Sequence, residues 1–119
     1  MEETKEWLKK AKRDLDSAKY NYKGKKYDVS AFLLQQCVEK SLKTVYIKKF
    51  KSLLKIHDIV MIGRKIDLPE DLLKECESLN SVYLESRYPD VPYSDYKKEE
   101  IEFYIKTAQK ILKWTKKNI

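Results

Sequence analysis

The chain has 119 residues, and its 26 lysines and arginines against 19 acidic residues give it a net charge of +7. A chain of this length can bury a core as one domain, so we expect a single domain over residues 1–119. Two separated cysteines and one histidine exclude the common zinc and disulfide frameworks, and no apolar run of about 18 residues marks a membrane span or signal peptide. We therefore expect a cytoplasmic protein with no membrane contact and no metal or other cofactor, whose two thiols are reduced and partly buried.

Two glycines, three prolines and little alternation of apolar and polar residues predict an all-α fold. The first helix is expected over residues 4–22, with Thr4 as its N-cap. Residues 21–28, which include Gly24, form a short basic turn. The first helix has one apolar stripe, made of Trp7, Leu8, Ala11, Leu15, Ala18 and Tyr22.

The next helix is expected to continue to about residue 50 and to be central, because it has two contrasting faces. One face is an apolar stripe of Ala31, Leu34, Val38, Leu42 and Val45. The other is a mixed stripe of Phe32, Gln36, Glu39, Lys43, Tyr46 and Phe50. The apolar stripe suits the core of the chain, and the mixed stripe suits a partner subunit or a ligand.

Residues 51–57 are predicted to connect to a short third helix with Ile59, Ile62 and Ile66, weakened by Gly63. Pro69 suits the first position of a fourth helix. The stripe of that helix is Leu72, Cys76, Leu79 and Tyr83.

Two prolines make residues 87–93 a stiff loop, and the last helix is expected over residues 95–117. Its stripe is Ile101, Tyr104, Ile105, Ala108, Ile111, Leu112 and Thr115. Phe103 and Trp114 lie on a different side with Lys110, where we expect a partner surface.

Three polar clusters occur in order: Gln35-Gln36-Cys37-Val38-Glu39-Lys40, His57-Asp58-Ile59, and Ser86-Arg87-Tyr88-Pro89-Asp90. Together they resemble a HEPN domain, and the resemblance covers nearly the whole chain. It implies an antiparallel up-and-down four-helix bundle with a short additional helix. It also implies a homodimer, often encoded beside a minimal nucleotidyltransferase in prokaryotes. Association with a nucleotide or RNA follows by analogy.

Ribonucleases of this family have an arginine followed, after four to six residues, by a histidine. Counting from Arg87, that histidine would fall at Pro92, Tyr93 or Ser94, and none of these side chains ionises near neutral pH. The ribonuclease motif is therefore not intact. His57 and Tyr93 are the remaining candidates for an acid or base. The simpler role for His57 is a neutral ring bonded to Asp58 or to the backbone, with Asp58 as a helix N-cap.

Arg87 is expected to point inward, where its guanidinium needs an anion. In the structural interpretation, Glu39 or Asp90 supplies this anion. In the functional interpretation, Arg87 binds a nucleotide phosphate together with two lysines, and a tyrosine lies against the base. The full set of candidate binding residues is Arg87, Lys40, Lys43, Gln36, Glu39 and Tyr88, with Tyr93 as an alternative to Tyr88.

Three functions stay open at this point. The first is a non-catalytic dimer that binds a nucleotide or a nucleotidyltransferase. The second is a metal-independent endoribonuclease in which Arg87 stabilises the phosphorane. The third is a helical adaptor without a ligand. The positive charge is compatible with phosphate binding, but solvated helix faces explain it equally well.

Overall fold

The computed structural model describes residues 2–82 and 95–119. Its helices are α1 (Glu2–Lys23), α2 (Tyr27–Phe50), α3 (Ile59–Lys65), α4 (Glu70–Asn80) and α6 (Lys98–Lys117). Several predicted positions lie outside the described residues: Tyr83, Arg87, Tyr88, Asp90 and Tyr93. In the described ranges no helix is both long enough and apolar enough to cross a membrane.

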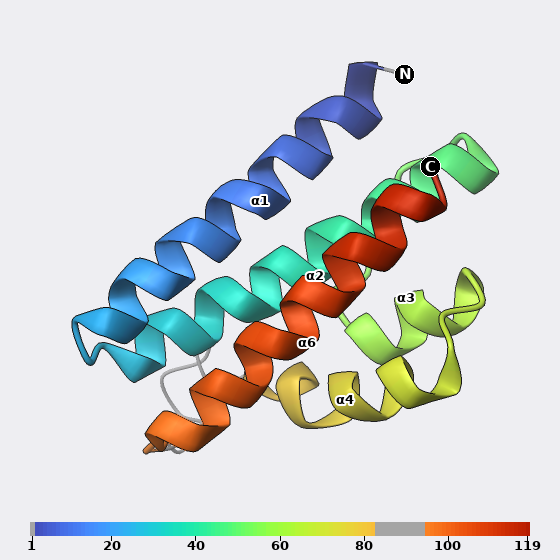
Figure 1. The fold of residues 1–119 in the computed structure, drawn as a ribbon. Coiled ribbons are helices and arrows are strands. Elements are labelled where there is room, and N and C mark those ends of the chain that lie inside the picture. Colours follow the sequence, from blue (N-terminus) through green and yellow to red (C-terminus); the bar gives the residue numbers. More distant parts are fainter. Residues whose placement is uncertain (1, 83–94) are drawn as a thin grey trace.

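Helices α1, α2, α4 and α6 run alternately up and down, and the short α3 precedes α4 on one side of the bundle (Figure 1). The predicted all-α bundle with a short additional helix is confirmed. The turn between α1 and α2 lies at one end of the molecule near the start of α6, while both chain termini lie at the other end. Residues far apart in sequence therefore meet at each end of the bundle.

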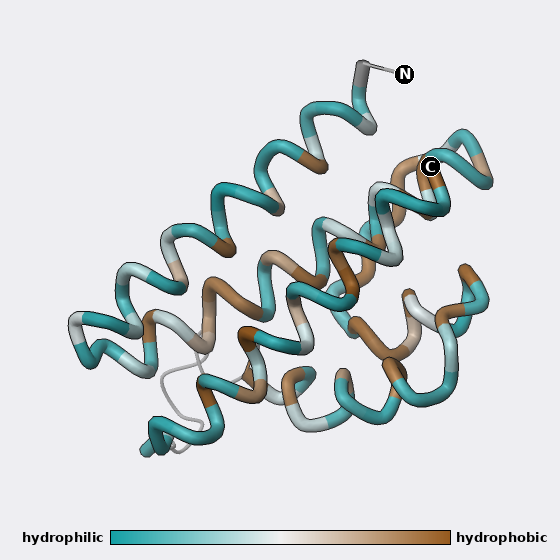
Figure 2. The backbone as a smooth tube through the Cα atoms, in the orientation of Figure 1, coloured by the Kyte–Doolittle hydropathy of each residue, from teal (hydrophilic) through white to brown (hydrophobic). Residues whose placement is uncertain are grey.

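Helix α2 is central because it contacts α1, α3, α4 and α6. The predicted apolar stripe, from Ala31 to Val45, is buried along its whole length. Hydroxyl residues of α2 are also buried: Ser30 Oγ donates to the carbonyl of Ala18 at 2.8 Å, and Ser41 Oγ to that of Cys37 at 2.7 Å. Small side chains and internally bonded hydroxyls let neighbouring helices approach α2 from several sides. Figure 2 shows mainly hydrophilic residues along α1 and longer apolar stretches in α2 and α3.

The second face of α2 differs from the prediction of an open partner or ligand surface. Glu39 and Lys43, in the middle of this face, are buried within the chain. Towards its end, the rings of Tyr46 and Phe50 pack against each other with centroids 4.6 Å apart and planes inclined at 39°, and Phe50 is 47% exposed. Only the ends of the mixed stripe thus reach the surface.

The turn between α1 and α2 is tighter than the predicted 21–28 segment, since α1 ends at Lys23 and α2 begins at Tyr27. Lys26 N donates to Asn21 O at 2.8 Å and Lys25 N to Tyr22 O at 3.0 Å, and Lys25 has a positive φ of 61°. This is a Schellman motif, which satisfies carbonyls at the end of α1. At the other end, Thr4 lies inside α1 and is buried, so its prediction as the N-cap is wrong.

Asp58 is the N-cap of α3, as predicted, and its Oδ1 accepts from Met61 N at 3.0 Å. Gly63 has a structural role beyond weakening the helix: a Cβ there would lie 2.9 Å from Leu73 Cδ2 and 3.1 Å from Leu68 Cδ2. The glycine lets α3 pack closely against the start of α4. Pro69 occupies the N-cap of α4, one position before its predicted place.

Helix α6 begins at Lys98, three residues after the predicted start. Glu100 sets this boundary, because its Oε1 accepts from Lys97 N at 3.1 Å just before the first turn.

Candidate functional site

Glu39, in the middle of α2, is the centre of a buried polar cluster. Its carboxylate accepts from Gln35 Nε2 at 3.2 Å and from Lys43 Nζ at 3.0 Å, and its Oε2 lies 3.0 Å from His57 Nδ1. Residues four apart share one face of a helix, which explains why Gln35, Glu39 and Lys43 line up. The Glu39 side chain is only 6% exposed, so these partners replace water around its charge.

Lys43 is buried with Glu39, and its side chain is 5% exposed. Its Nζ lies 5.9 Å from the centroid of the Trp7 ring on α1, a cation–π distance. Lys43 was predicted to contact a phosphate. In the structure its ammonium group is already paired with Glu39 and lies over the Trp7 ring.

His57 lies in the connector between α2 and α3 and meets Glu39 at the edge of the bundle. Its Nδ1 meets the Glu39 carboxylate, a partner that the prediction of Asp58 or a backbone group did not include. Asp58 is occupied elsewhere, since its Oδ1 accepts from Met61 N and from Asn80 Nδ2 at 2.9 Å. The His57 side chain is 46% exposed and so reaches the surface, while its contact with a buried carboxylate orients the ring.

Gln36 extends the cluster to the surface on α2. Its Nε2 donates to Gln35 Oε1 at 2.7 Å, and Gln36 itself is half-buried. We call Gln35, Gln36, Glu39, Lys43 and His57 the polar cluster. It runs from the half-buried amide of Gln36 through the core to the half-exposed His57.

Lys40 belongs to a different contact, because it forms a salt bridge with Asp14 of α1. The structure therefore brings together Gln36, Glu39, Lys43 and His57 but separates Lys40 from them. The predicted contacts of Arg87, Tyr88 and Tyr93 lie outside the described residues.

Three residues that contact the candidate site residues were not among the candidates: Gln35 and Trp7, which contact the polar cluster, and Asp14, which contacts Lys40. Gln35 had a signal in the Gln-Gln pair, since two amides in an apolar helix need partners when buried. Trp7 and Asp14 gave no such signal, because their contacts depend on how α1 docks against α2.

The cysteines are not part of the cluster. Burial raises the pKa of the Cys37 and Cys76 thiols to about 12, so both remain protonated and unreactive near neutral pH. The described residues contain no group of three or more His, Cys, Asp or Glu side chains placed to hold a metal ion.

The face expected to meet a partner is partly packed. Trp114 is half-buried against the core, whereas Phe103 is 44% exposed and lies 6.1 Å from the Tyr104 ring, centroid to centroid. Nearby, Lys110 Nζ forms a salt bridge of 3.1 Å with Glu75 of α4. Phe103 is thus the open aromatic of this face.

Residues 4–119 match the family model of the HEPN domain, which spans almost the entire chain. The chain belongs to the HEPN domain family. This HEPN chain is also 31% identical to a Methanocaldococcus jannaschii protein called "Putative toxin MJ1304", over 89% of this chain and 81% of that protein.

Two solved structures share the fold. The crystal structure of TT1696 from Thermus thermophilus has a TM-score of 0.89 and 26% identity, and covers 100% of both chains. The crystal structure of ST0689, described as an archaeal HEPN homologue, has a TM-score of 0.80 and 33% identity over 96% of this HEPN chain and 95% of that one. The arrangement of helices described above is therefore that of HEPN proteins.

Proposed function

We propose that this HEPN chain is a non-catalytic nucleotide-binding module that acts as a homodimer and associates with a minimal nucleotidyltransferase. The observation that carries the proposal is the polar cluster. Buried charges are costly, and replacing such a pair by apolar residues often stabilises a protein. A chain of polar groups that leads from the core to two surface side chains, Gln36 and His57, therefore favours a role in binding.

The charges of the cluster favour recognition by hydrogen bonds. Lys43 and Glu39 neutralise each other at 3.0 Å, so they offer little net charge to a phosphate. The half-buried Gln36 amide and the half-exposed His57 imidazole are groups of the kind that recognise the hydrogen-bonding edge of a base. In this proposal Arg87 and Tyr88, which follow α4 in the sequence, supply the phosphate and stacking contacts.

Binding of a fluorescent ATP analogue tests this proposal. Gln36→Ala and His57→Ala should each weaken binding about tenfold or more, because a hydrogen bond to a charged or well-placed polar group contributes roughly 1–3 kcal/mol. Lys74→Ala, an exposed residue of α4, is the control and should bind like wild type. Wild-type protein that shows no binding at millimolar nucleotide would contradict the proposal.

The partner is tested separately. A minimal nucleotidyltransferase encoded next to this chain should co-elute with it in gel filtration after co-expression. Separate elution of the two purified proteins at micromolar concentration would remove this part of the proposal and leave nucleotide binding standing.

One observation favours a second candidate, a metal-independent endoribonuclease. A buried carboxylate that orients an imidazole, as Glu39 orients His57, is an arrangement found in acid–base catalysis. His57 would then act as base, in place of the missing histidine of the Arg-x4-6-His motif, and Arg87 would stabilise the phosphorane. The toxin in the name of the Methanocaldococcus relative is compatible with this role.

Cleavage of a mixed RNA in EDTA and at low salt decides between the two candidates. Under the ribonuclease hypothesis, wild type cleaves, while His57→Ala and Arg87→Ala are each at least a hundredfold slower. Intact RNA with all three proteins would reject the enzyme and favour the binding module. Cleavage that persists in both variants would point to a contaminating nuclease.

A further inference from the structure

A hollow lies at the end of the bundle where the turn between α1 and α2 meets the start of α6. Its volume is about 450 Å³, and it is lined by Tyr22, Lys23, Lys25, Tyr27 and Lys98. Ligand pockets typically have volumes of about 300–1,000 Å³. The hollow therefore has room for a ligand of about the size of one nucleotide.

Two sequence segments rich in lysine and tyrosine contribute to the hollow, the second of them through Lys98. The first is Tyr22-Lys23-Gly24-Lys25-Lys26-Tyr27 and the second is Tyr96-Lys97-Lys98. Lysines interleaved with tyrosines combine cations for phosphates with ring faces for bases, which is the composition of single-strand binding surfaces.

The two tyrosines of the hollow are held in defined positions. The rings of Tyr22 and Tyr27 are 6.0 Å apart between centroids and inclined at 38°. The Tyr22 hydroxyl donates a hydrogen bond to Glu102, which raises the pKa of Tyr22 to about 12. Tyr22 thus stays neutral near pH 7, and its hydroxyl gives the Glu102 carboxylate a hydrogen-bond partner.

The lysines of the hollow differ from the paired lysines elsewhere. Lys40, Lys43, Lys49 and Lys110 all form salt bridges, whereas no carboxylate of the described residues lies within salt-bridge distance of Lys23, Lys25 or Lys98. All three hollow lysines are exposed.

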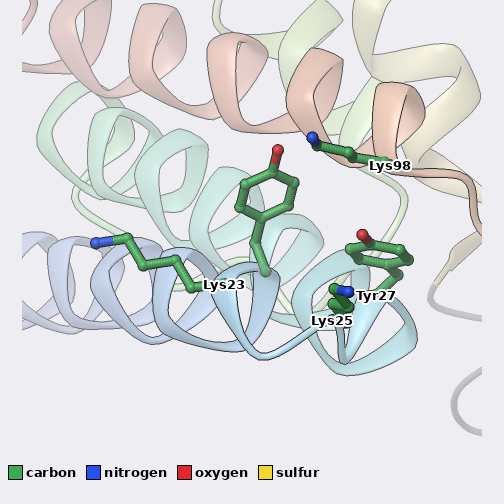
Figure 3. Close-up of a pocket in the computed structure, with 5 residues that line it drawn as sticks. Lys23, Lys25, Tyr27 and Lys98 are labelled. Atoms are coloured by element: carbon green, nitrogen blue, oxygen red, sulfur yellow. The ribbon is translucent and has the colours of Figure 1, made fainter.

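The lysines do not contribute equally. Figure 3 shows Lys25 next to Tyr27 and Lys98 reaching across from the start of α6, while Lys23 extends away from them along α1. The Schellman motif fixes the backbone at Lys25 through the bonds of Lys25 N and Lys26 N. Lys25 and Lys98 thus border the hollow from two different elements, the turn after α1 and the start of α6.

We propose that this hollow binds one nucleotide unit of a single-stranded nucleic acid, with its phosphodiester between Lys25 and Lys98 and its base against Tyr27. The hollow is separate from the polar cluster: Tyr27 and Glu39 are twelve residues apart, or about 18 Å along α2 at 1.5 Å per residue. The inference goes beyond the proposed function and does not depend on it.

Fluorescence anisotropy with a labelled adenine octamer, as RNA and as DNA, tests this site across a series of salt concentrations. Each phosphate of a single strand that the chain neutralises should add about 0.7 to the magnitude of the slope of log K against log salt. Because Lys25 and Lys98 flank one phosphodiester in this proposal, the double variant Lys25→Gln with Lys98→Gln should bind at least tenfold more weakly and reduce the magnitude of this slope by about 0.7. The matched control is Lys74→Gln with Lys113→Gln, two exposed lysines of α4 and α6 that lie outside the hollow. It removes the same charge and should leave the slope unchanged.

The stacking contact is tested by Tyr27→Leu and Tyr27→Phe. Tyr27 also packs against the core, so leucine keeps an apolar contact while removing the ring face. Leucine should weaken binding about tenfold and phenylalanine should not, because stacking needs the ring and not the hydroxyl. Thermal melts of each variant confirm that it is folded.

The results with RNA, with DNA and with the variants decide whether the hollow is the binding site and which nucleic acid it prefers. Equal affinity for RNA and DNA assigns recognition to the phosphodiester and base that they share, and tighter RNA binding identifies RNA as the natural source of that unit. The proposal is overturned if the Lys25 and Lys98 double variant behaves like its control, or if the wild type binds neither strand. The octamer titration of the Lys25 and Lys98 double variant and the ATP-analogue titration of the wild type are scored separately, so failure here and failure of the proposed function are distinguishable.

Discussion

Lys25 carries the strain of the turn between α1 and α2, since its φ of 61° lies in the left-handed region that favours glycine. We predict that Lys25→Gly stabilises the chain by about 0.5–1 kcal/mol, because glycine removes the steric cost while keeping the Schellman hydrogen bonds. Urea unfolding followed by circular dichroism measures this. Lys26→Gly is the matched control: Lys26 has φ −92°, so the same substitution should destabilise the chain slightly. Equal effects at the two positions would contradict the argument.

The buried pair of Glu39 and Lys43 gives a second prediction at this scale. Glu39→Gln leaves the Lys43 ammonium buried without a counter-ion, and we expect a loss of about 3 kcal/mol or more in the free energy of unfolding. Lys43→Met, which leaves the carboxylate with fewer partners, should cost a similar amount. Urea unfolding of each variant is the measurement.

The double variant Glu39→Met with Lys43→Met separates charge from packing. Since it removes both charges and keeps similar volume, its stability should return to within about 1 kcal/mol of wild type. A double variant as unstable as the sum of the single ones would show that the pair acts through packing with Trp7 rather than through its charges.

Individual site residues could be predicted from the sequence where their partners share one helix. Glu39 and Lys43 are four residues apart on α2, so helical spacing alone places them together. The sequence indicates a structural role for His57 but does not indicate Glu39 as its partner. Its contact with Glu39 joins residues 18 apart through the path of a loop, which periodicity does not describe.

At the scale of elements, the start of α3 depends on a contact with the end of α4. Asp58 Oδ1 accepts from Met61 N and Asn80 Nδ2, and Asn80 Oδ1 accepts from Ile59 N at 2.9 Å. Two side chains thus satisfy the first amides of α3 and connect it to α4.

We predict that Asp58→Ala destabilises the chain by about 1–2 kcal/mol, and that Asp58→Ser recovers part of this because serine also caps helices. Asn80→Ala should cost a similar amount, since it leaves Ile59 N without its acceptor. Thermal unfolding of the three variants measures the effects. Full stability of Asp58→Ala would show that the cap is dispensable and that packing alone holds α3.

Helix existence and type were predictable for this chain, and exact ends were less so. The spacing of Ile59, Ile62 and Ile66 was enough for α3, and the apolar stripe of α2 was enough for its central position. The ends depend on local hydrogen bonds instead. Helix α1 ends at Lys23 because the Schellman bonds close there, and α6 starts at Lys98 because Glu100 caps the backbone of Lys97.

At the scale of the whole molecule, the Tyr–Lys hollow, the polar cluster and the exposed Phe103 lie in different parts of the bundle. The Tyr–Lys hollow lies at the end with the turn between α1 and α2, whereas Glu39, the centre of the polar cluster, is about 18 Å further along α2 than Tyr27. The middle of the second α2 face is covered by the chain itself, so a partner surface there would be restricted to the ends of the stripe. Phe103 of α6 is then the aromatic side chain of the expected partner face that stays exposed.

We predict that the chain is a dimer in light scattering at micromolar concentration and that Phe103→Arg shifts it towards the monomer. Phe103 is 44% exposed, and an arginine in its place would put an uncompensated charge into an apolar contact between subunits. Tyr20→Arg is the control, because Tyr20 is 78% exposed on α1 and should leave both the mass and the melting temperature unchanged. Since Phe103 contributes little to the core, the Phe103→Arg monomer should remain helical in circular dichroism. A wild type that is already monomeric would show that this face does not join two copies, and a dimer that resists Phe103→Arg would place the interface elsewhere on the molecule.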